Sequence, residues 1–510
     1  MKKLPVRHLY RSILKQVNHT SFSDVQYVKD RVRSEFKKAA SLTSELDILM
    51  AYKVNQSEFN YLERAEILAT FWYFMKVLEY KKYSTALNAL TALTVTVFLI
   101  IMYQYLNIVQ STVTRYMINN DDCPFVQPSY DKLYLDNRKR FSKELKQPTE
   151  FIMASALRPV RVGTDTDYPG YRQESNIIYL LGMMNISPSL LYVKWNGTKL
   201  DLTLLLPEMS QRERIFGGDL LDKNVLAKIY DLDHVVDMSS ILNFTVKDQS
   251  LYTISPRKDI NSALGPLILQ KLVSKNVTFT LNSEIVDTFH KVRFTKSLKE
   301  IQMIGYATKV AKWAHQRLAQ IVSRSRIVSE MDLVNSYNYY IMKCGGRLSA
   351  YNPIVGFGID SATLHFRTGE NETRGYQKIS PKSNFILIDA APEYKGYASD
   401  ITRTIYPQHS SRHALIYDIV LKCQKAAISS FKMDMYWTDV EDEAYKCLTI
   451  SLLQHNFFLR TSLQELLLEK AYYAFMPHGL GHPVGLDVHD PAPKSKHYRL
   501  SNGIVHTIEV

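Results

Sequence analysis

The pattern of hydrophobic and polar positions divides the chain into regions of different character. Residues 1–80 place apolar residues at spacings of three and four, as in VRHLYRSILKQV and VQYVKDRVRSEFKKAA, which predicts helices. Residues 130–285 alternate β-rich runs with helical runs, which predicts an α/β domain. The β-rich runs are NIIYLLGM, SLLYVKW, LDLTLLLP, HVVDM and FTLN.

The region from residue 291 to residue 510 opens with a long amphipathic pattern, KSLKEIQMIGYATKVAKWAHQRLAQIV. It continues with two strand-like runs, FILIDAAPEY and YASDITRTIYP, then helical patterns to about Tyr473 and strand-like ends at LDVHD and IVHTIEV. The two strand-like runs flank Lys395-Gly396, and this dipeptide predicts the turn of a β-hairpin.

Residues 83–114 contain no charged residue. The stretch 86–106, ALNALTALTVTVFLIIMYQYL, is long and apolar enough for a transmembrane helix. Asn88 and Gln104 weaken that signal, and a buried amphipathic helix is the alternative. If the stretch spans a membrane, Lys81 and Lys82 place its N-terminal side in the cytoplasm or matrix.

Composition narrows the function classes. A chain of 510 residues predicts two or three domains. The net charge of +13 gathers partly in the first forty residues, with no basic run interleaved with aromatics, so we expect no nucleic-acid partner. A basic N-terminus without a signal-peptide core favours a mitochondrial or cytoplasmic protein. Four cysteines without CxxC spacing predict neither a disulfide scaffold nor a zinc site and suit a reducing compartment.

Two carboxylates carry the first chemical signal. Asp389 lies in an apolar strand-like run, and Asp400 lies in the run that returns beside it. Buried carboxylates are costly unless they are paired or bound to metal, and a divalent cation removes their mutual repulsion. Ordinary turn or surface acids are the alternative interpretation.

Histidines form the second signal. The stretch MPHGLGHPVGLDVHDP supplies His478, His482 and His489, and GIVHTIEV supplies Glu509. A ligand set of two Asp, one His and one Glu favours Mn²⁺ or a similar ion over zinc. A pair of such ions can activate a bridging water and polarise a carbonyl.

These motifs resemble the signature stretches of the pita-bread metallopeptidases, closest to prolidase and aminopeptidase P. IDAAPEYKGYASDITRTIYP and FMPHGLGHPVGLDVHD carry the resemblance, with DTDYPGYRQESNIIYLLGM (165–183) and DSATLHF (360–366) upstream. It covers residues 130–510 and implies an α+β fold. In that fold a pita-bread domain at 291–510 follows an α/β domain at 130–285, and the helical segment 1–80 is an N-terminal extension.

The resemblance implies a role for each matching residue. Asp389 binds one metal, Asp400 bridges two, and His482 ligates the other. Glu509 is a metal ligand that also acts as general acid or base. The implied cofactor is Mn²⁺, two ions per site, with other divalent ions as alternatives.

Other histidines match residues that contact substrate in this family. His365 and His489 bind substrate and stabilise the tetrahedral intermediate, and both count as catalytic. His478 lines the pocket wall. Arg172, in the RQES run, is expected to be an interdomain or oligomer contact rather than a catalytic group.

The chain also departs from the family pattern. The family carries a further glutamate that bridges both metals in a later strand, whereas this sequence stops at Val510. The expectation is therefore a C-terminally incomplete dimetal site, in a truncated chain or a fusion of neighbouring coding regions.

The N-terminal segment has a resemblance of its own. HLYRSILK followed by VRSEFKKAA is similar to the LYR-motif family of basic three-helix mitochondrial proteins. The matching residues are Leu9, Tyr10, Arg11 and Phe36, and the implied partner is acyl carrier protein. A solvated amphipathic helix is the alternative.

The leading hypothesis is a metallo-exopeptidase that hydrolyses bonds involving proline, as an Xaa-Pro dipeptidase or an Xaa-Pro aminopeptidase. The expected partners are proline-containing peptides, a second copy in a homodimer, and a membrane contacted through residues 86–106. The competing hypothesis is an inactive pita-bread remnant fused to an LYR-type mitochondrial assembly adaptor.

Overall fold

The computed structural model describes residues 122–510, apart from gaps at 130–131, 165, 169, 184, 245–249, 371–374, 382–383, 407–410 and 459–461. These residues belong to one compact unit, Asn119–Val510. The helices expected in 1–80, the apolar stretch 83–114 and the LYR-like residues Leu9, Tyr10, Arg11 and Phe36 lie outside the described residues. Within the described part, no helix has both the length and the apolar character needed to cross a bilayer.

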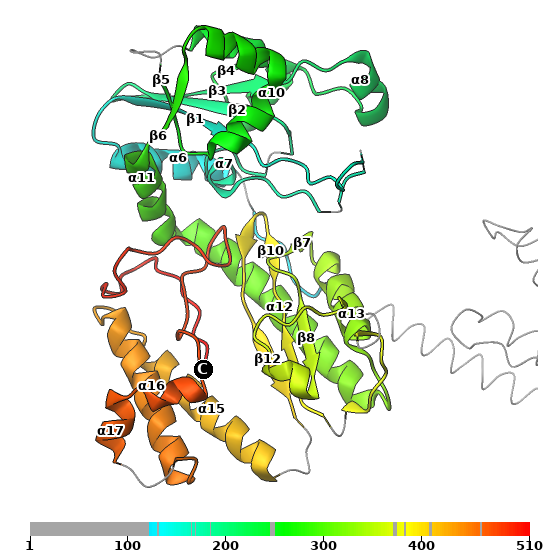
Figure 1. Ribbon diagram of the computed structural model, residues 1–510, viewed down its shortest axis with the longest axis vertical. Helices are drawn as coiled ribbons and strands as arrows, with labels where there is room; N and C mark the ends of the chain where they lie inside the picture. The colour runs from blue at the N-terminus through cyan, green and yellow to red at the C-terminus, as the bar shows by residue number, and fades with distance from the viewer. Residues whose placement is uncertain are drawn as a thin grey trace, which may run out of the picture. The chain divides into compact units, whose positions relative to one another are not determined.

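The first half of the unit is built on a six-stranded sheet with the order β4-β3-β2-β1-β5-β6 (Figure 1). Its strands are β1 (Thr149–Ala154), β2 (Leu190–Trp195), β3 (Leu200–Leu206), β4 (His234–Asp237), β5 (Ser250–Thr253) and β6 (Thr278–Leu281). The first three pair antiparallel, whereas β4, β5 and β6 add in parallel. The alternation of strands and helices expected for this region is confirmed.

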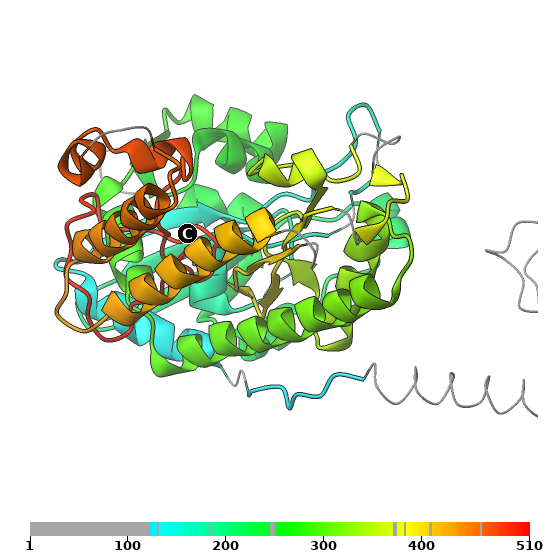
Figure 2. The ribbon, with the colours of Figure 1, turned by 90° about the horizontal axis from the view of Figure 1, so that it is seen from below.

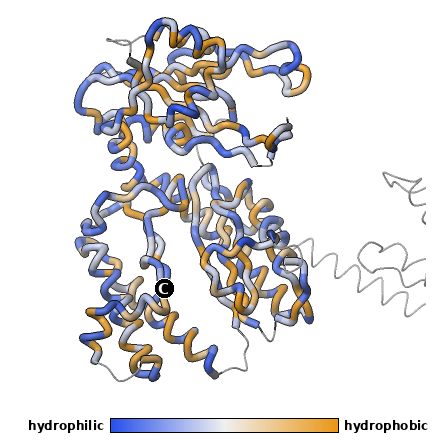
Figure 3. Tube along the Cα trace, viewed as in Figure 1, coloured by the Kyte–Doolittle hydropathy of each residue, from blue (hydrophilic) through white to orange (hydrophobic). Residues whose placement is uncertain are grey.

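Helices cover both faces of this sheet. They are α6 (Leu133–Glu144), α7 (Ser175–Leu181), α8 (Gln211–Gly217), α9 (Lys223–Tyr230), α10 (Arg257–Ser274) and α11 (Ser283–Phe294), with the 3₁₀ helix η1 (Met238–Asn243). Successive residues of β1 point to opposite faces. Phe151 therefore packs in one core against Phe141 and Phe289, while Ile152 packs in the second core. Figure 3 shows hydrophobic and hydrophilic stretches alternating along these elements.

One expected strand is a helix. NIIYLLGM forms most of α7, which begins after Glu174, whose side chain accepts a hydrogen bond from the Ile177 amide. Six of the seven residues of α7 are buried. A helix buried on all sides has no polar face, so its short apolar run is indistinguishable from a buried strand by periodicity alone.

The second half of the unit begins with the long amphipathic helix expected there. This helix, α12 (Leu298–Arg324), starts at a capping box between Ser297 and Glu300 and is followed by α13 (Glu330–Lys343). Two three-stranded sheets pack against α12 and α13, with orders β11-β10-β7 and β12-β9-β8 (Figure 1). Their strands are β7 (Leu348–Ser349), β8 (Ile354–Phe357), β9 (Ile386–Asp389), β10 (Pro392–Tyr394), β11 (Tyr397–Ala398) and β12 (Thr402–Ile405), with η3 (Gly358–Ala362) after β8.

The expected hairpin is confirmed. Tyr394 of β10 pairs with Tyr397 of β11, and Lys395 and Gly396 between them have φ of 52° and 85°. Positive φ at both central residues is the geometry of a type I′ turn, whose twist matches that of paired strands.

The helices expected up to Tyr473 are also present. They are α15 (Ser411–Ser430), α16 (Trp437–Gln454), α17 (Leu463–Leu468) and the 3₁₀ helix η5 (Ala471–Ala474). Figure 2 shows α15 and α16 lying side by side. Their core includes Trp437 and Leu448, and Ile508 and Val510 near the end of the chain pack against it.

The C-terminal segment, residues 476–510, differs from expectation. Neither LDVHD nor IVHTIEV forms a named strand in the structure. The isolated bridge Pro483↔His506, together with backbone hydrogen bonds, joins IVHTIEV to residues 480–484 instead of to LDVHD. Because the paired stretches are short and form no continuous ladder, the apolar pattern of IVHTIEV does not produce a strand of a sheet.

The cysteine expectation is wrong. The structure pairs Cys123 with Cys344 and Cys423 with Cys447 as disulfides. The two pairs span 221 and 24 residues of sequence. Such separations give no spacing signal, since only the fold brings the members of each pair together.

Candidate metal centre

The two carboxylates come from neighbouring strand ends. Asp389 is the last residue of β9, opposite Thr402 of β12 and Ile354 of β8. Asp400 lies between β11 and β12, two residues before Thr402. The expected strand position is therefore correct for Asp389, whereas the returning run breaks into two strands at Asp400.

A tyrosine hydroxyl joins the two carboxylates. The Tyr351 hydroxyl lies 2.5 Å from Asp389 Oδ1 and 2.9 Å from Asp400 Oδ1. A phenol has one proton and can satisfy one of these oxygens at a time. Burial, with the nearby charge of Asp400, raises the pKa of Asp389 to about 6. The pair therefore favours a proton or a cation between its oxygens.

The C-terminal segment brings a histidine and a glutamate to the same place. The Thr507 amide donates to the His482 carbonyl at 2.9 Å, and the Glu509 amide donates to the Leu480 carbonyl at 2.6 Å. This pairing places His482 Nε2 3.2 Å from Glu509 Oε1 and 3.4 Å from Asp400 Oδ2. Ligand atoms of Asp400, His482 and Glu509 all lie within 4.8 Å of one another.

The electrostatics of this group suit a cation. Burial alone would lower the pKa of His482, but the carboxylates of Asp400 and Glu509 raise it to about 10. In the same way burial would raise the pKa of Glu509, whereas its contacts with His482 and Thr507 lower it. The two carboxylates of Asp400 and Glu509 thus favour a positive charge at the position of His482.

The donor set fits a divalent metal ion. Glu509 Oε1 is shielded from solvent and, among the described residues, accepts no hydrogen bond of good geometry. Two carboxylates and one imidazole are ligands that Mn²⁺ and related ions accept. Asp389 is not a member of the three-residue group and is linked to it through Tyr351 and Asp400.

The remaining candidate histidines lie around this group. The His489 ring is 4.1 Å from the His482 ring, centroid to centroid, and burial and the charge of His482 lower the pKa of His489. His365 is exposed after η3, close enough for its charge to lower the pKa of His489 as well. His478 is half-buried, and its charge lowers the pKa of Glu509.

Sequence reasoning missed Tyr351. The residue lies between β7 and β8, upstream of the stretch that holds His365. A polar side chain placed just before a buried strand could have drawn attention to it, because strand ends are where polar groups converge on a site.

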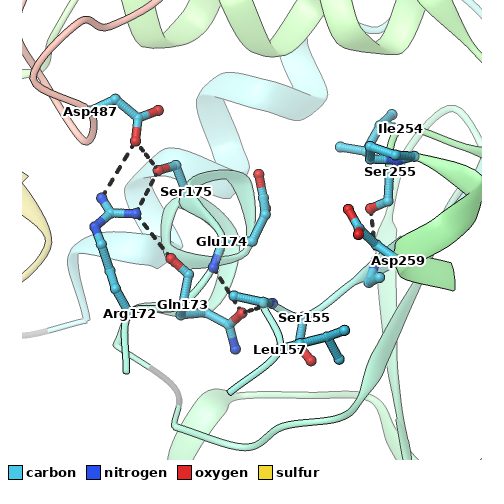
Figure 4. A pocket seen from close by; sticks show the side chains of 13 residues that line it. Ser155, Leu157, Arg172, Gln173, Glu174, Ser175, Ile254, Ser255, Asp259 and Asp487 are labelled. Carbon is cyan, nitrogen blue, oxygen red and sulfur yellow. Dashed lines mark hydrogen bonds and ion pairs between the residues drawn. The ribbon is translucent and has the colours of Figure 1, made fainter. Parts of the chain in front are cut away.

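A separate pocket of about 480 Å³ lies at the ends of β1 and β5 (Figure 4). Residues 172–175 line it together with Asp487, and none of the three clustered ligands does. Arg172 points from this pocket toward Asp487 (Figure 4). The guanidinium forms an ion pair with Glu393 of β10 at 2.8 Å.

Comparisons with known proteins place this geometry in a class. The profile of metallopeptidase family M24 matches residues 302–510, and that of the aminopeptidase P N-terminal domain matches residues 134–252. A third profile, Complex 1 protein (LYR family), matches residues 4–60. The chain is thus a two-part M24-type metallopeptidase with an LYR-like segment before it, as the motifs predicted.

Individual relatives narrow the class. A probable Xaa-Pro aminopeptidase of Talaromyces marneffei is 30% identical over 328 residues, which is 64% of this chain and 68% of the relative. Proline aminopeptidase P II from Yersinia pestis superposes with a TM-score of 0.64 and 25% identity, covering 74% of this chain and 87% of that one. Zinc-substituted Escherichia coli aminopeptidase P in complex with product gives a TM-score of 0.63 and 25% identity, covering 75% and 87%.

The chain belongs to the Xaa-Pro aminopeptidase family. The relatives confirm the α+β fold class with its pita-bread domain, and they favour the peptidase hypothesis over the inactive-remnant alternative. Arg172 and Glu393 lie in the ranges matched by the two peptidase profiles, so their ion pair confirms the interdomain contact expected of Arg172.

Proposed function

We propose that this chain is a metallo-exopeptidase that hydrolyses the peptide bond between an N-terminal residue and a following proline. The observation that carries the proposal is the convergence of Asp400, His482 and Glu509 within 4.8 Å, with Asp389 joined to them through Tyr351. The names of the relatives favour an aminopeptidase over a dipeptidase.

We infer that the metal is Mn²⁺, bound as two ions in the intact site of the family, with other divalent ions as alternatives. Asp389 would hold one ion, His482 the other, and Asp400 would bridge them, with Glu509 as a further ligand. Bound divalent ions supply an activated water and a polarised carbonyl. The ligand chemistry of the four residues supports this assignment.

The other side chains would handle protons and substrate. Glu509 has a pKa below its usual range, so it is ionised and able to accept a proton from the attacking water. His489 has a lowered pKa and can donate a hydrogen bond from a neutral imidazole to the oxyanion that develops on the substrate. The exposed His365 and the half-buried His478 would bind the peptide beside the cluster.

Hydrolysis by purified full-length protein tests the proposal. With Mn²⁺ supplied, we expect release of the first residue from a peptide with proline at its second position and none when alanine replaces that proline. Asp400→Asn should abolish turnover and weaken Mn²⁺ binding measured by calorimetry, because a carboxamide cannot bridge two cations.

The matched control is Asp219→Asn, since Asp219 is a surface carboxylate with 77% of its side chain exposed. It should leave turnover and metal binding unchanged. Wild-type protein that binds no metal at micromolar supply, or an active Asp400→Asn variant, would refute the assignment.

We further propose partners for the parts beyond the metal centre. The match of residues 4–60 to the LYR family supports contact with acyl carrier protein through Leu9, Tyr10, Arg11 and Phe36, and a mitochondrial location. Co-purification with acyl carrier protein that is lost on Tyr10→Ala would support the contact. A homodimer, and membrane association through residues 86–106, complete the proposal and are testable by light scattering and by vesicle flotation.

A further inference from the structure

The loop that carries His489 is held by charges from outside it. This His489 loop, residues 483–490, is closed on itself by hydrogen bonds from the Gly485 amide to the Asp487 carbonyl and from the Asp490 amide to the Pro483 carbonyl, both 3.0 Å. A side chain at Gly485 would meet the Asp490 carboxylate at 2.4 Å. The glycine therefore lets the two sides of the loop approach.

Two cations from the end of α11 fix one side of the loop. Arg293 lies 2.5 Å from Asp487 Oδ2 and 2.7 Å from Asp490 Oδ1. Lys296 lies 3.0 Å from Asp490 Oδ2, and both side chains are 1% exposed. Buried charges of this kind are tolerated only when they are paired and hydrogen-bonded, so the loop has little freedom to shift on this side.

Arg172 and Ser175, at the start of α7, fix the other side (Figure 4). The Ser175 hydroxyl donates to Asp487 Oδ1 at 2.6 Å, and Arg172 donates to the Leu486 carbonyl and lies 3.6 Å from Asp487 Oδ1. The same guanidinium donates to Glu393 of β10 at 2.8 Å. One planar group therefore touches both the hairpin between Asp389 and Asp400 and the loop between His482 and His489.

We propose that Arg172 is a positioning residue that sets the His489 imidazole against the metal centre. The inference rests on the proposed function and adds a role for the first half of the unit in the chemistry of the second. Arg172 does not reach His489 itself. It holds Leu486 and Asp487, and His489 follows two residues later with its ring against that of His482.

Arginine is the residue type that this role requires. Its rigid fork can donate to Glu393, Ser175 and the Leu486 carbonyl at the same time. A lysine keeps the charge but is a point donor on a flexible stem and cannot hold three acceptors in a plane. Arg172→Lys therefore removes the geometry while avoiding an unpaired Glu393 carboxylate in the interior.

The test is steady-state kinetics on Arg172→Lys with an Xaa-Pro peptide and Mn²⁺. We expect kcat to fall about 10- to 100-fold, as for other residues that orient a catalytic group, with KM and Mn²⁺ affinity little changed. In the His489→Ala background the same substitution should have no further effect on kcat. Ser175→Ala, which removes one hydrogen bond to Asp487, should lower kcat by a smaller factor, again with KM and Mn²⁺ affinity little changed.

Arg158→Lys is the matched control. Arg158 also donates to a backbone carbonyl, that of Asn185 at 3.4 Å, and lies over the Tyr171 ring, but it does not contact the His489 loop. It should leave kcat unchanged. An unaltered kcat in Arg172→Lys, or effects of Arg172→Lys and His489→Ala that simply add, would overturn the inference.

Hydrogen exchange of the His489 loop separates this inference from the proposed function. Arg172→Lys, and not Arg158→Lys, should speed exchange of the Gly485 and Asp490 amides. A wild-type protein without turnover contradicts the proposed function, whatever the loop does. A wild-type protein with turnover whose loop exchange is unchanged by Arg172→Lys contradicts the positioning role alone.

Discussion

The two sources of ligands at the metal centre are held in different ways. Asp389 ends β9 and Asp400 lies between β11 and β12; β9 pairs with β12 in one ladder, and β10 and β11 pair in another that turns at Lys395-Gly396. His482 and Glu509 come from the C-terminal segment, residues 476–510, which has isolated bridges and no named strand. Strand pairing places the two aspartates. Backbone hydrogen bonds between residues 480–484 and 505–509 place His482 and Glu509, and buried ion pairs hold the adjacent His489 loop, so different substitutions should disrupt each region.

The largest effect is expected from Arg293→Met. It leaves Asp490, with a side chain 1% exposed, without one of its two cations, and breaking a buried ion pair on one side costs about 3–5 kcal/mol. Urea unfolding should report the loss, with exchange of the His489 loop rising more than exchange of β9. Lys291→Met, at a side chain 70% exposed, is the control and should change the free energy of unfolding little. An equal loss of unfolding free energy in Arg293→Met and Lys291→Met would show that the buried ion pairs do not hold the C-terminal segment.

The Cys423–Cys447 disulfide should give the next largest effect. It links α15 to α16, and Gln424 of α15 bonds the backbone of Ile508 and Val510. Replacing both cysteines by alanine should cost about 2–4 kcal/mol, since the closed loop restrains the unfolded chain. Exchange at Ile508 should rise and exchange in β9 should not. Mass spectrometry showing two free thiols in oxidised wild-type protein would contradict the pairing.

Tyr351→Phe tests the other source of ligands. Removing the Tyr351 hydroxyl that Asp389 and Asp400 share should lower the free energy of unfolding of metal-free protein by about 1.5–3 kcal/mol, because hydrogen bonds to charged groups are strong. Added Mn²⁺ should reduce the difference in the free energy of unfolding between Tyr351→Phe and wild type.

Tyr337→Phe is the matched control for that substitution. The Tyr337 hydroxyl is buried and, within the described part of the chain, has no hydrogen-bond partner. Its removal should leave the free energy of unfolding unchanged or slightly raise it. A similar cost for both variants would mean that Tyr351 does not bridge the carboxylates.

The smallest effect is expected at the hairpin turn. Gly396→Ala forces a φ of 85° on an alanine and brings its Cβ to 3.1 Å from Ile178. We therefore expect the free energy of unfolding to fall by about 1–2 kcal/mol. Gly217→Ala, with open space around it and no positive φ, should be neutral or mildly stabilising in the same thermal melts. No difference between the two alanines would mean that the turn conformation contributes little.

The amino-acid sequence alone determined the elements whose cause is local. The turn at Lys395-Gly396 follows from a glycine between two β-rich runs, because glycine adopts positive φ without steric cost, and the start of α12 follows from the reciprocal cap of Ser297 and Glu300. The identities of the candidate ligands were also readable, because few side chains bind divalent ions and motif spacing marks them.

Tertiary structure decided the features that join distant parts of the chain. The run that forms α7 was read as a strand, since an apolar segment buried on every side has no periodicity to distinguish the two. Tyr351 between the carboxylates, the disulfide from Cys123 to Cys344 and the contact of Arg172 with Leu486 each need two segments to meet in space. Such meetings depend on how the whole core packs, and no local pattern of residues encodes them.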